Sequence, residues 1–481
     1  MIAFKKNLRI AITSCCILFL SPDFVAAKVI LPSFFSDGMV LQQQTDAALW
    51  GWAKPGVVIK INTSWNKKNY TANVEANGKW SIKVATPVAG GPYSITISDG
   101  EALTIKNILI GEVWLCSGQS NMEMPMKGFK DQPIIGSNDV IFNSTNDQIR
   151  IYTVPRAVER NTKDTGKTSS WKNCNPENIS NFSAVGYYFG KILQQQLKVP
   201  VALILDAYSG SPAEAFMSAE SLKAFPEIVI PAANGTEKLS NKNATTLYNG
   251  MIHPFAGYTI KGCLWYQGES NYDRPDQYEK LFPAMVQLWR SEWGQGNFPF
   301  YFAQIAPYAY SSLPAGFRNE KLNSAYLRDA QRKSVAAIPN SGMVVLMDAG
   351  DEKTIHPFNK EIVGKRFAYL ALGDTYQYKG FGYQSPLYDS LIVMGNVATI
   401  KFKNAANGLT SFTKPITQFE IAGADKTFYP AQAVIARGNV LVSSPMVATP
   451  VAVRYAFKDF IIGELFSAEG YPVSSFRTDD W

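Results

Sequence analysis

The 481-residue chain is predicted to contain an α/β domain with a parallel sheet, flanked by two β-rich segments. Three observations support this prediction. Residues 28–105 alternate like β-strands, residues 106–380 alternate apolar strand-like runs with helical patterns, and residues 385–481 return to strand patterning. A chain of this length exceeds one ordinary core, so it is predicted to fold as more than one domain.

The chain starts with the pattern of a cleavable secretion signal over residues 1–27. Basic residues precede an apolar stretch at 10–20 that is too short to span a bilayer, and small residues at 25–27 suit cleavage before Lys28. The alternative is an uncleaved membrane anchor. We therefore expect a secreted or periplasmic protein with no stable membrane insertion after signal cleavage.

The segment 28–105 is predicted to be a small β-sandwich-like domain. Strand patterns at 70–74 and 80–84 flank Asn77-Gly78, a strong turn signal, which predicts that the two strands form a hairpin. No residue pattern in this segment indicates chemistry of its own.

The segment 106–380 is predicted to be the α/β domain. A helix over 278–289 shows apolar residues at spacings of three and four, with Pro283 expected to kink it. Ligands of parallel α/β sheets bind at the carboxyl ends of the strands. The predicted strands are 113–115, 201–205, 264–266, 300–305 and 343–347.

The segment 385–481 is predicted to hold further strands. Residues 397–402 alternate, Asn407-Gly408 marks a turn, and 451–455 is a short apolar run. These strands form either a C-terminal β-domain or an extension of the N-terminal one.

The most informative motif is the octapeptide 116–123, Cys-Ser-Gly-Gln-Ser-Asn-Met-Glu, which directly follows the predicted strand 113–115. Ser120 therefore falls on a tight turn just past a strand end. Gly118 allows the turn, and the strand holds the hydroxyl in place. This arrangement predicts a nucleophilic serine and acyl-transfer chemistry.

A serine nucleophile needs a base, and histidine is the side chain best suited to this role near neutral pH. The chain has two histidines. His356 follows the predicted strand 343–347 and so shares the edge of the sheet with Ser120, which favours it over His253. A third group would orient the imidazole, and the sequence leaves this choice open among nearby acids. These acids are Asp348, Asp351 and Glu352.

The developing oxyanion needs hydrogen-bond donors at the same edge. The backbone N–H of Ser120 is one candidate. Two further polar turns follow predicted strands, at 209–211 and at 267–271, where Gly210 could expose its N–H and Gln267 could donate from its amide.

Charge and cysteine content exclude other classes of function. The net charge is +7 without any Lys/Arg block, so no nucleic-acid partner is expected. The cysteines beyond the signal are odd in number and form no disulfide framework, although their pairing is left open. No Cys/His cluster has the spacing of metal ligands, so no metal is expected. These cysteines are Cys116, Cys174 and Cys263.

The motifs together resemble the sialate O-acetylesterase family of carbohydrate acetylesterases, within the SGNH-hydrolase superfamily. The matching blocks are 118–123, 249–254, 262–271, 355–357 with Lys360 and Gly364, and 476–481. The likeness runs from about Leu31 to Trp481. It implies an SGNH-type α/β/α hydrolase domain with a parallel sheet.

The resemblance implies that Ser120 is the nucleophile and His356 its base, with Ser120, Gly210 and Gln267 forming the oxyanion hole. Relatives often carry an acid two residues before the histidine, where this chain has Thr354. Asp351 is therefore the preferred triad acid, and a dyad with a backbone carbonyl holding the ring is the alternative. Candidate substrate-binding residues are Gln119, Asn121, Glu269 and Asn271.

The expected function is a serine esterase that removes O-acetyl groups from carbohydrates, first of all O-acetylated sialic acids, through an acetyl-enzyme and without a cofactor. Acetylated plant polysaccharide such as xylan is the alternative substrate. A catalytically inactive sugar-binding protein is the alternative of another class. A general lipase or peptidase is disfavoured because Ser120 lacks the Gly-x-Ser-x-Gly elbow. The sequence predicts no particular oligomeric state.

Overall fold

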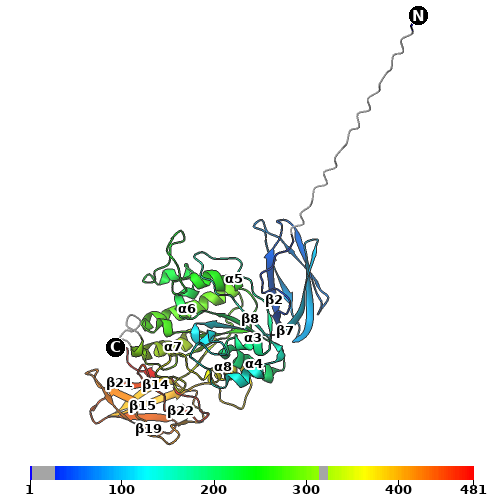
Figure 1. Ribbon diagram of the computed structural model, residues 1–481. Helices are drawn as coiled ribbons and strands as arrows, with labels where there is room; N and C mark the ends of the chain where they lie inside the picture. The colour runs from blue at the N-terminus through cyan, green and yellow to red at the C-terminus, as the bar shows by residue number, and fades with distance from the viewer. Residues whose placement is uncertain (3–27, 314–322) are drawn as a thin grey trace.

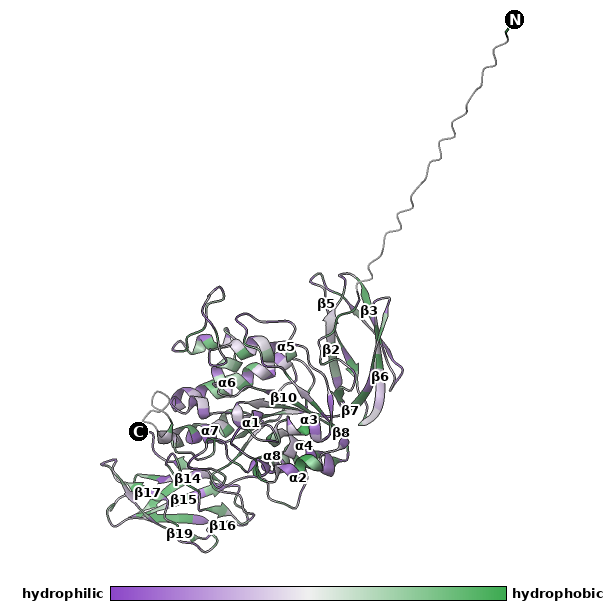
Figure 2. Cartoon of the chain, in the orientation of Figure 1, coloured by the Kyte–Doolittle hydropathy of each residue, from purple (hydrophilic) through white to green (hydrophobic). Residues whose placement is uncertain are grey.

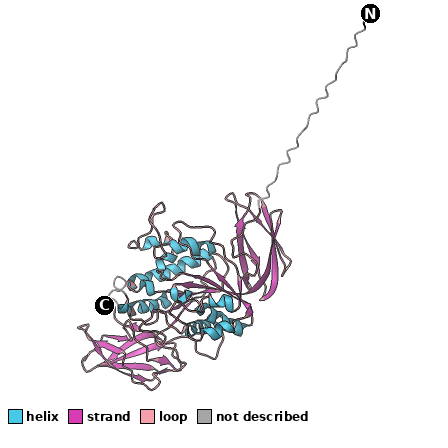
Figure 3. Ribbon diagram, in the orientation of Figure 1, coloured by secondary structure: helices cyan, strands magenta, loops and turns pink. Residues whose placement is uncertain are grey.

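The computed structural model describes residues 1–2, 28–313 and 323–481, so the predicted signal segment lies outside the described residues. Strands make up both ends of the described chain, and the helices gather in the middle (Figure 3). None of the helices in the described ranges combines the length and the apolar character that crossing a bilayer requires. The predicted α/β domain between two β-rich segments is confirmed.

The N-terminal segment is built from two layers of strands. β3 pairs with β4 and β6, whereas β5 pairs with β2. The predicted hairpin across Asn77-Gly78 is therefore wrong: the turn exists, with Gly78 N donating to Glu75 O at 2.9 Å, but its two strands enter opposite sheets. The strands are β1 (Val40–Gln42), β2 (Asp46–Trp52), β3 (Val58–Thr63), β4 (Asn69–Asn73), β5 (Lys79–Ala85) and β6 (Gly90–Ser98).

One long strand, β7 (Ala102–Gly118), joins this segment to the α/β domain. Its first part pairs with β6 up to Ile110, and its second part enters the central sheet from Glu112 onward. The strand runs straight through the predicted boundary at 105/106, because the same backbone serves both sheets (Figure 1).

The central sheet has the order β13-β12-β11-β7-β10-β8-β9. All neighbours from β13 to β8 are parallel, which confirms the predicted parallel sheet, and β9 is antiparallel. Gly118 pairs with Ala207 and with Tyr266, so three strands end level at one edge. The strands are β8 (Asn146–Thr153), β9 (Lys172–Cys174), β10 (Val201–Ala207), β11 (Gly262–Tyr266), β12 (Phe300–Ala303) and β13 (Ser341–Val344).

Helices cover both faces of this sheet. Because side chains alternate along a strand, Trp114 and Cys116 pack with α4 and α8, whereas Val113 and Leu115 lie in the core that contains α6 and α7. Pro283 lies inside α6. The helices are α1 (Ser120–Glu123), α2 (Ser137–Phe142), α3 (Pro176–Ser180), α4 (Ala184–Leu197), α5 (His253–Phe255), α6 (Pro275–Trp293), α7 (Ala325–Ala337) and α8 (Lys360–Asp374).

The C-terminal segment forms sheets of its own and does not extend the N-terminal one. Its strands are largely hydrophobic (Figure 2), which matches buried residues such as Ile400 and Val440 facing one another. The strands are β14 (Leu387–Met394), β15 (Val397–Lys403), β16 (Leu409–Thr410), β17 (Phe419–Ala422), β18 (Phe428–Pro430), β19 (Gln432–Ala436), β20 (Asn439–Ser443), β21 (Ala452–Tyr455), β22 (Phe466–Ser467) and β23 (Phe476–Arg477).

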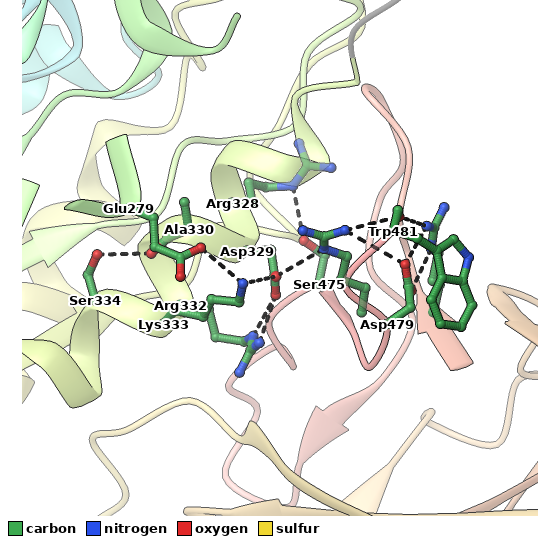
Figure 4. A network of polar contacts seen from close by, with 12 residues as sticks. Glu279, Arg328, Asp329, Ala330, Arg332, Lys333, Ser334, Ser475, Asp479 and Trp481 are labelled. Carbon is green, nitrogen blue, oxygen red and sulfur yellow. Dashed lines mark hydrogen bonds and ion pairs between the residues drawn. The ribbon is translucent and has the colours of Figure 1, made fainter. Parts of the chain in front are cut away.

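A buried polar network fastens the end of the chain to α7 (Figure 4). Arg477 Nε lies 3.5 Å from Asp329 Oδ2, and Arg328 Nε donates to Ser475 Oγ at 3.1 Å. Arg328 and Asp329 are both buried, so removing one partner would leave a charged group without compensation in the interior. The C-terminal segment is thereby held on the α/β domain.

Candidate active site

The turn that carries Ser120 is fixed by backbone contacts. Gly118 has φ +136°, and a Cβ on it would come within 2.1 Å of the Tyr266 carbonyl oxygen, so only glycine fits. The N–H of Gln119 donates to the same carbonyl at 3.0 Å. Ser120 then opens α1 at the level carboxyl edge of the sheet, with 7% of its surface exposed.

The side chains on either side of Ser120 hold the neighbouring loops. Gln119 Oε1 accepts from the N–H of Ser270 at 3.1 Å and, at 3.4 Å, from that of Gly268, after β11. Glu123 Oε2 accepts from the N–H of Ser209 at 2.8 Å and from its hydroxyl at 2.5 Å, after β10. The nucleophile motif therefore positions both turns that were predicted to supply oxyanion donors.

Asn121 links the turn of Ser120 to the loop of His356. Its Nδ2 donates to the Ile355 carbonyl at 3.0 Å and to Glu269 Oε1 at 2.5 Å, and its Oδ1 accepts from the ammonium group of Lys360. Asn121 and Lys360 are completely buried. The residue after Ser120 thus holds the residue before His356, so the turn of Ser120 and the loop of His356 lie next to each other.

The ionisable groups around Asn121 have shifted pKa values because they are buried. Burial lowers the pKa of Lys360 to about 7, while the nearby Glu269 carboxylate opposes this shift. Burial also raises the pKa of Glu269, whose Oε2 has no hydrogen-bond partner within the described ranges. The ammonium of Lys360 lies 5.8 Å from the centre of the Tyr266 ring. These groups are shielded from solvent beside the candidate base.

His356 is oriented by a neutral amide. Its Nδ1 lies 2.6 Å from Gln132 Oε1, and the Phe129 ring packs edge-on against it at 5.3 Å between centroids. Since Oε1 only accepts, Nδ1 carries the proton and Nε2 is left as the basic atom. Burial, and then the positive charge of Lys360, lower the pKa of His356 to about 4. The imidazole is therefore neutral, as a general base must be.

The structure does not bring Asp351 to the imidazole. Its Oδ1 accepts from the N–H of Lys353 at 2.8 Å and of Thr354 at 3.0 Å, the pattern of a side chain that shapes its own loop. Among the described residues, the hydrogen-bond acceptor at His356 Nδ1 is Gln132 and not an acid.

The other two candidate acids are also engaged elsewhere or exposed. Asp348 forms a paired interaction with Arg366, at 2.7 Å and 2.6 Å between oxygens and guanidinium nitrogens. Glu352 is exposed to solvent. His253 lies on α5, with its Nδ1 3.9 Å from Glu292 Oε2, and takes no part in the network around Ser120.

Backbone groups, and not the amide of Gln267, are the open donors. Gln267 Nε2 donates to the Ser211 carbonyl at 3.2 Å and to Asn271 Oδ1 at 2.6 Å, so both of its N–H groups are used. The backbone N–H groups of Ser120 and Gly210 have no acceptor among the residues that the structure describes. Gly210 has φ +73° and lies in the loop that Glu123 holds through Ser209.

The four residues proposed to bind substrate are buried, and their side chains form hydrogen bonds with neighbouring residues. Gln119 and Asn121 hold loops as described, and Asn271 Nδ2 donates to Glu214 Oε2 at 2.9 Å while its Oδ1 accepts from Ala213 N at 2.9 Å. Glu269 is the one of the four that also lines a cavity, of about 460 Å³, next to Gly210. This cavity offers room for a sugar beside Gly210, whose N–H is a candidate oxyanion donor.

Sequence reasoning missed the roles of Gln132 and Glu123. Gln132 lies 224 positions from His356 in a loop without periodicity, so no local pattern distinguishes it from other surface glutamines. Glu123 belongs to the nucleophile motif, and its spacing from Ser120 places it at the end of the same short helix. That spacing was the available signal for Glu123, whereas Gln132 offered none.

The chain is similar in sequence to known carbohydrate esterases. Residues 110–371 match the sequence model described as "Carbohydrate esterase, sialic acid-specific acetylesterase". The human sialate O-acetylesterase is 29% identical over 399 residues, covering 76% of this chain and 74% of the relative. The mouse sialate O-acetylesterase is 27% identical over 440 residues, with 79% and 78% covered.

A solved structure is similar over almost the whole chain. It is a carbohydrate acetylesterase from Xanthomonas citri, with a TM-score of 0.85 and 34% sequence identity. The alignment covers 94% of this chain and 100% of that one, so the flanking β-segments are shared as well as the central domain.

Proposed function

Because the chain belongs to the sialic acid-specific acetylesterase family of carbohydrate esterases, it is a carboxylic ester hydrolase, and we propose that it removes O-acetyl groups from sugars, first of all from O-acetylated sialic acids. The observation that carries the proposal is the hydrogen bond by which Asn121 joins the turn of Ser120 to the loop of His356. This residue follows Ser120 and donates to Ile355, the residue before His356, at 3.0 Å. A serine next to a neutral histidine is an arrangement that can perform acyl transfer, because the imidazole can take the hydroxyl proton.

In the proposed reaction, Ser120 Oγ attacks the acetyl carbonyl carbon while His356 Nε2 takes the hydroxyl proton. The carbonyl oxygen gains the negative charge and accepts from the N–H groups of Ser120 and Gly210. His356 then returns the proton to the sugar oxygen, which leaves as an alcohol. Water, deprotonated by His356, attacks the acetyl-enzyme, and acetate is released as Ser120 regains its proton.

We propose that Gln132 takes the place usually held by a triad acid. A neutral amide fixes the tautomer and the ring orientation, as a carboxylate does, but adds no charge to stabilise the imidazolium. The proposal is supported by the 2.6 Å separation of Gln132 Oε1 from His356 Nδ1 and by the use of Asp351 within its own loop. In this proposal Ser120 and His356 perform the reaction, and the side-chain amide of Gln132 holds the imidazole in place.

The experiment measures the acetate that the mature chain releases and compares wild type with Ser120→Ala. The substrates are O-acetylated sialic acid, acetylated xylan and a small aryl acetate. Ser117→Ala is the matched control, because its hydroxyl lies on the same strand end and donates to the Asp206 carbonyl. We expect Ser120→Ala to lose activity on the order of 10⁶-fold. Ser117→Ala should lose only about 1 kcal/mol of stability.

The panel also separates the candidate substrates. Acetylated xylan is the second candidate because the similar protein from Xanthomonas citri is described as a carbohydrate acetylesterase, without restriction to sialic acid. Serine-dependent release from one glycan would identify the substrate class. Silence of the folded wild-type protein on all three would contradict the esterase assignment and favour a sugar-binding role.

A further inference from the structure

A second hollow lies between the N-terminal β-segment and the α/β domain. It has a volume of about 320 Å³, within the range of small-molecule sites. Strands β2 and β5 form one wall, and α5 with the end of α6 forms the other, where His253 and Glu292 lie. The two walls come from segments far apart in the sequence that lie side by side in Figure 1.

This cleft is remote from the candidate active site. The N-terminal segment joins the central sheet through β7 at Gly111, whereas Ser120 follows the other end of that strand at Gly118. A strand rises ~3.3 Å per residue, so these two ends are about 23 Å apart. A ligand in the cleft would therefore not present its acetyl group to Ser120.

Indole rings line the N-terminal wall. Along β2, Leu49 is buried in the sandwich, whereas Trp50 and Trp52 point to the opposite face and are only half-buried. Trp80 lies opposite Gly51 on β5, is 1% exposed, and its Nε1 has no hydrogen-bond partner among the described residues. Trp50 also packs against the buried rings of Phe34 and Phe35, at 5.4 Å and 4.7 Å between centroids. Trp52 lines the cleft without a ring contact to any other residue in the described ranges.

Carboxylates accompany these rings. Glu75, Asp164 and Glu292 line the cleft, and its one lysine, Lys79, is paired with Asp164 at 2.6 Å. The cleft is therefore net negative, which disfavours an anionic ligand such as a sugar acid. Carboxylates accept hydrogen bonds from hydroxyl groups, and an aromatic face packs against the C–H face of a sugar ring.

We propose that this cleft is a second, non-catalytic site that binds a neutral pyranose unit of a glycan chain. Half-exposed indoles would pack against the ring, and the carboxylates would accept from its hydroxyl groups. The inference goes beyond the esterase reaction and does not depend on it. Holding one part of a long glycan at the cleft raises the local concentration of its other units around the enzyme.

The test is tryptophan-indole NMR of the Ser120→Ala chain, whose ten tryptophans report on individual sites. The probes are xylotetraose, which is neutral, and an α2,8-linked sialic acid trimer, in which every unit carries a carboxylate. We expect xylotetraose to shift the indole signals of Trp50 and Trp52 and the sialic acid trimer to leave them unchanged. Xylotetraose carries no acetyl group, so the result is independent of catalysis.

Substitutions identify the site. Trp52→Ala should weaken xylotetraose binding about tenfold, the loss of ~1.4 kcal/mol, while Trp52→Phe keeps an aromatic face and should retain most of it. Trp481→Ala is the matched control, because this exposed tryptophan lies at the other end of the chain. Both Trp52 variants should hydrolyse the aryl acetate at the wild-type rate if Ser120 acts as proposed.

Several outcomes would overturn the proposal. They are the absence of any indole shift with either probe at millimolar concentration, binding that both Trp52 variants leave unchanged, and binding of the sialic acid trimer as tight as that of xylotetraose. Should Trp52→Ala fail to fold, Glu292→Gln replaces it, and unchanged xylotetraose affinity in that variant would argue against the carboxylates as acceptors.

Discussion

The two halves of the candidate site are held in different ways. Ser120 follows a strand of the central sheet, and its turn is fixed by backbone bonds and by a glycine that no other residue can replace. His356 lies in an irregular loop between β13 and α8, and two side chains from elsewhere in the chain reach this loop at the histidine: Gln132 at the ring and Asn121 at the Ile355 carbonyl.

The two halves should therefore differ in whether a mutation changes the stability of the fold or the reaction rate. The nucleophile turn belongs to the core of the sheet, so damage there should unfold the protein or remove the hydroxyl itself. The histidine half can be altered through one side chain while the fold remains, because Gln132 contacts the imidazole from outside the sheet and other bonds hold the loop itself. Reaction rate and pH dependence should therefore be separable from stability mainly on the histidine side.

The largest effect on that side is expected for His356→Ala. Without a base, the Ser120 hydroxyl keeps its proton, so kcat should fall on the order of 10⁶-fold at little cost in stability. His253→Ala is the matched control, since it is the other histidine of the chain and lies on α5. Acetate release and thermal melts check both. If His253→Ala is inactive and melts at the wild-type temperature, His253 is the base.

Gln132 should come next. Gln132→Ala frees the imidazole to rotate and change tautomer, and we expect roughly a 10²-fold loss in kcat/KM with little loss of stability. Gln132→Glu places a carboxylate against Nδ1, which stabilises the imidazolium and raises the pKa of His356 above its value of about 4. The acid limb of kcat/KM against pH should then move toward neutral pH. Unchanged rates in Gln132→Ala would refute its positioning role.

Lys360→Met should change the pH profile more than the rate. Removing the ammonium removes the repulsion that helps to lower the pKa of His356, so protonation begins at higher pH and activity falls earlier on acidification. Lys365→Met is the matched control, because Lys365 lies on the same helix but is paired with Glu361 at the surface. Identical pH profiles for the two variants would contradict the electrostatic role of Lys360.

The smallest effect is expected for Asp351→Asn. Asparagine keeps the Oδ1 that accepts from Lys353 and Thr354, so the loop and the rate should stay within a few-fold of wild type. A triad acid would behave otherwise, since its amide substitution costs about 10⁴-fold in kcat. A loss of that size in steady-state kinetics would return Asp351 to the triad.

The same contrast explains which parts of the site could be predicted from the sequence. Ser120, Gly118 and the parallel strands were predicted because strand periodicity and turn residues are local signals. The partner of His356 was not, because a side-chain contact across 224 positions leaves no periodic trace. The hairpin at Asn77-Gly78 failed for a related reason: the turn is local, but the pairing of its strands is decided by the packing of two sheets.

The same holds for the role of Gln267. The sequence predicted that Gln267 follows a strand, and a side-chain amide at that position can donate to an oxyanion. The structure directs both N–H groups toward Ser211 and Asn271, which only the folded loops bring into reach. Position relative to the sheet was thus predictable, whereas the use of each polar atom depended on tertiary contacts.

The central claim is that Ser120 carries the acetyl group during turnover. The most direct measurement is rapid acid quenching of the mature enzyme with an aryl acetate, followed by mass spectrometry of its peptides. If Ser120 is the nucleophile, one acetyl group is found on the peptide that contains Ser120, and it is present in Ser117→Ala and absent in Ser120→Ala. An acetyl group on another residue, or turnover in Ser120→Ala, would contradict it.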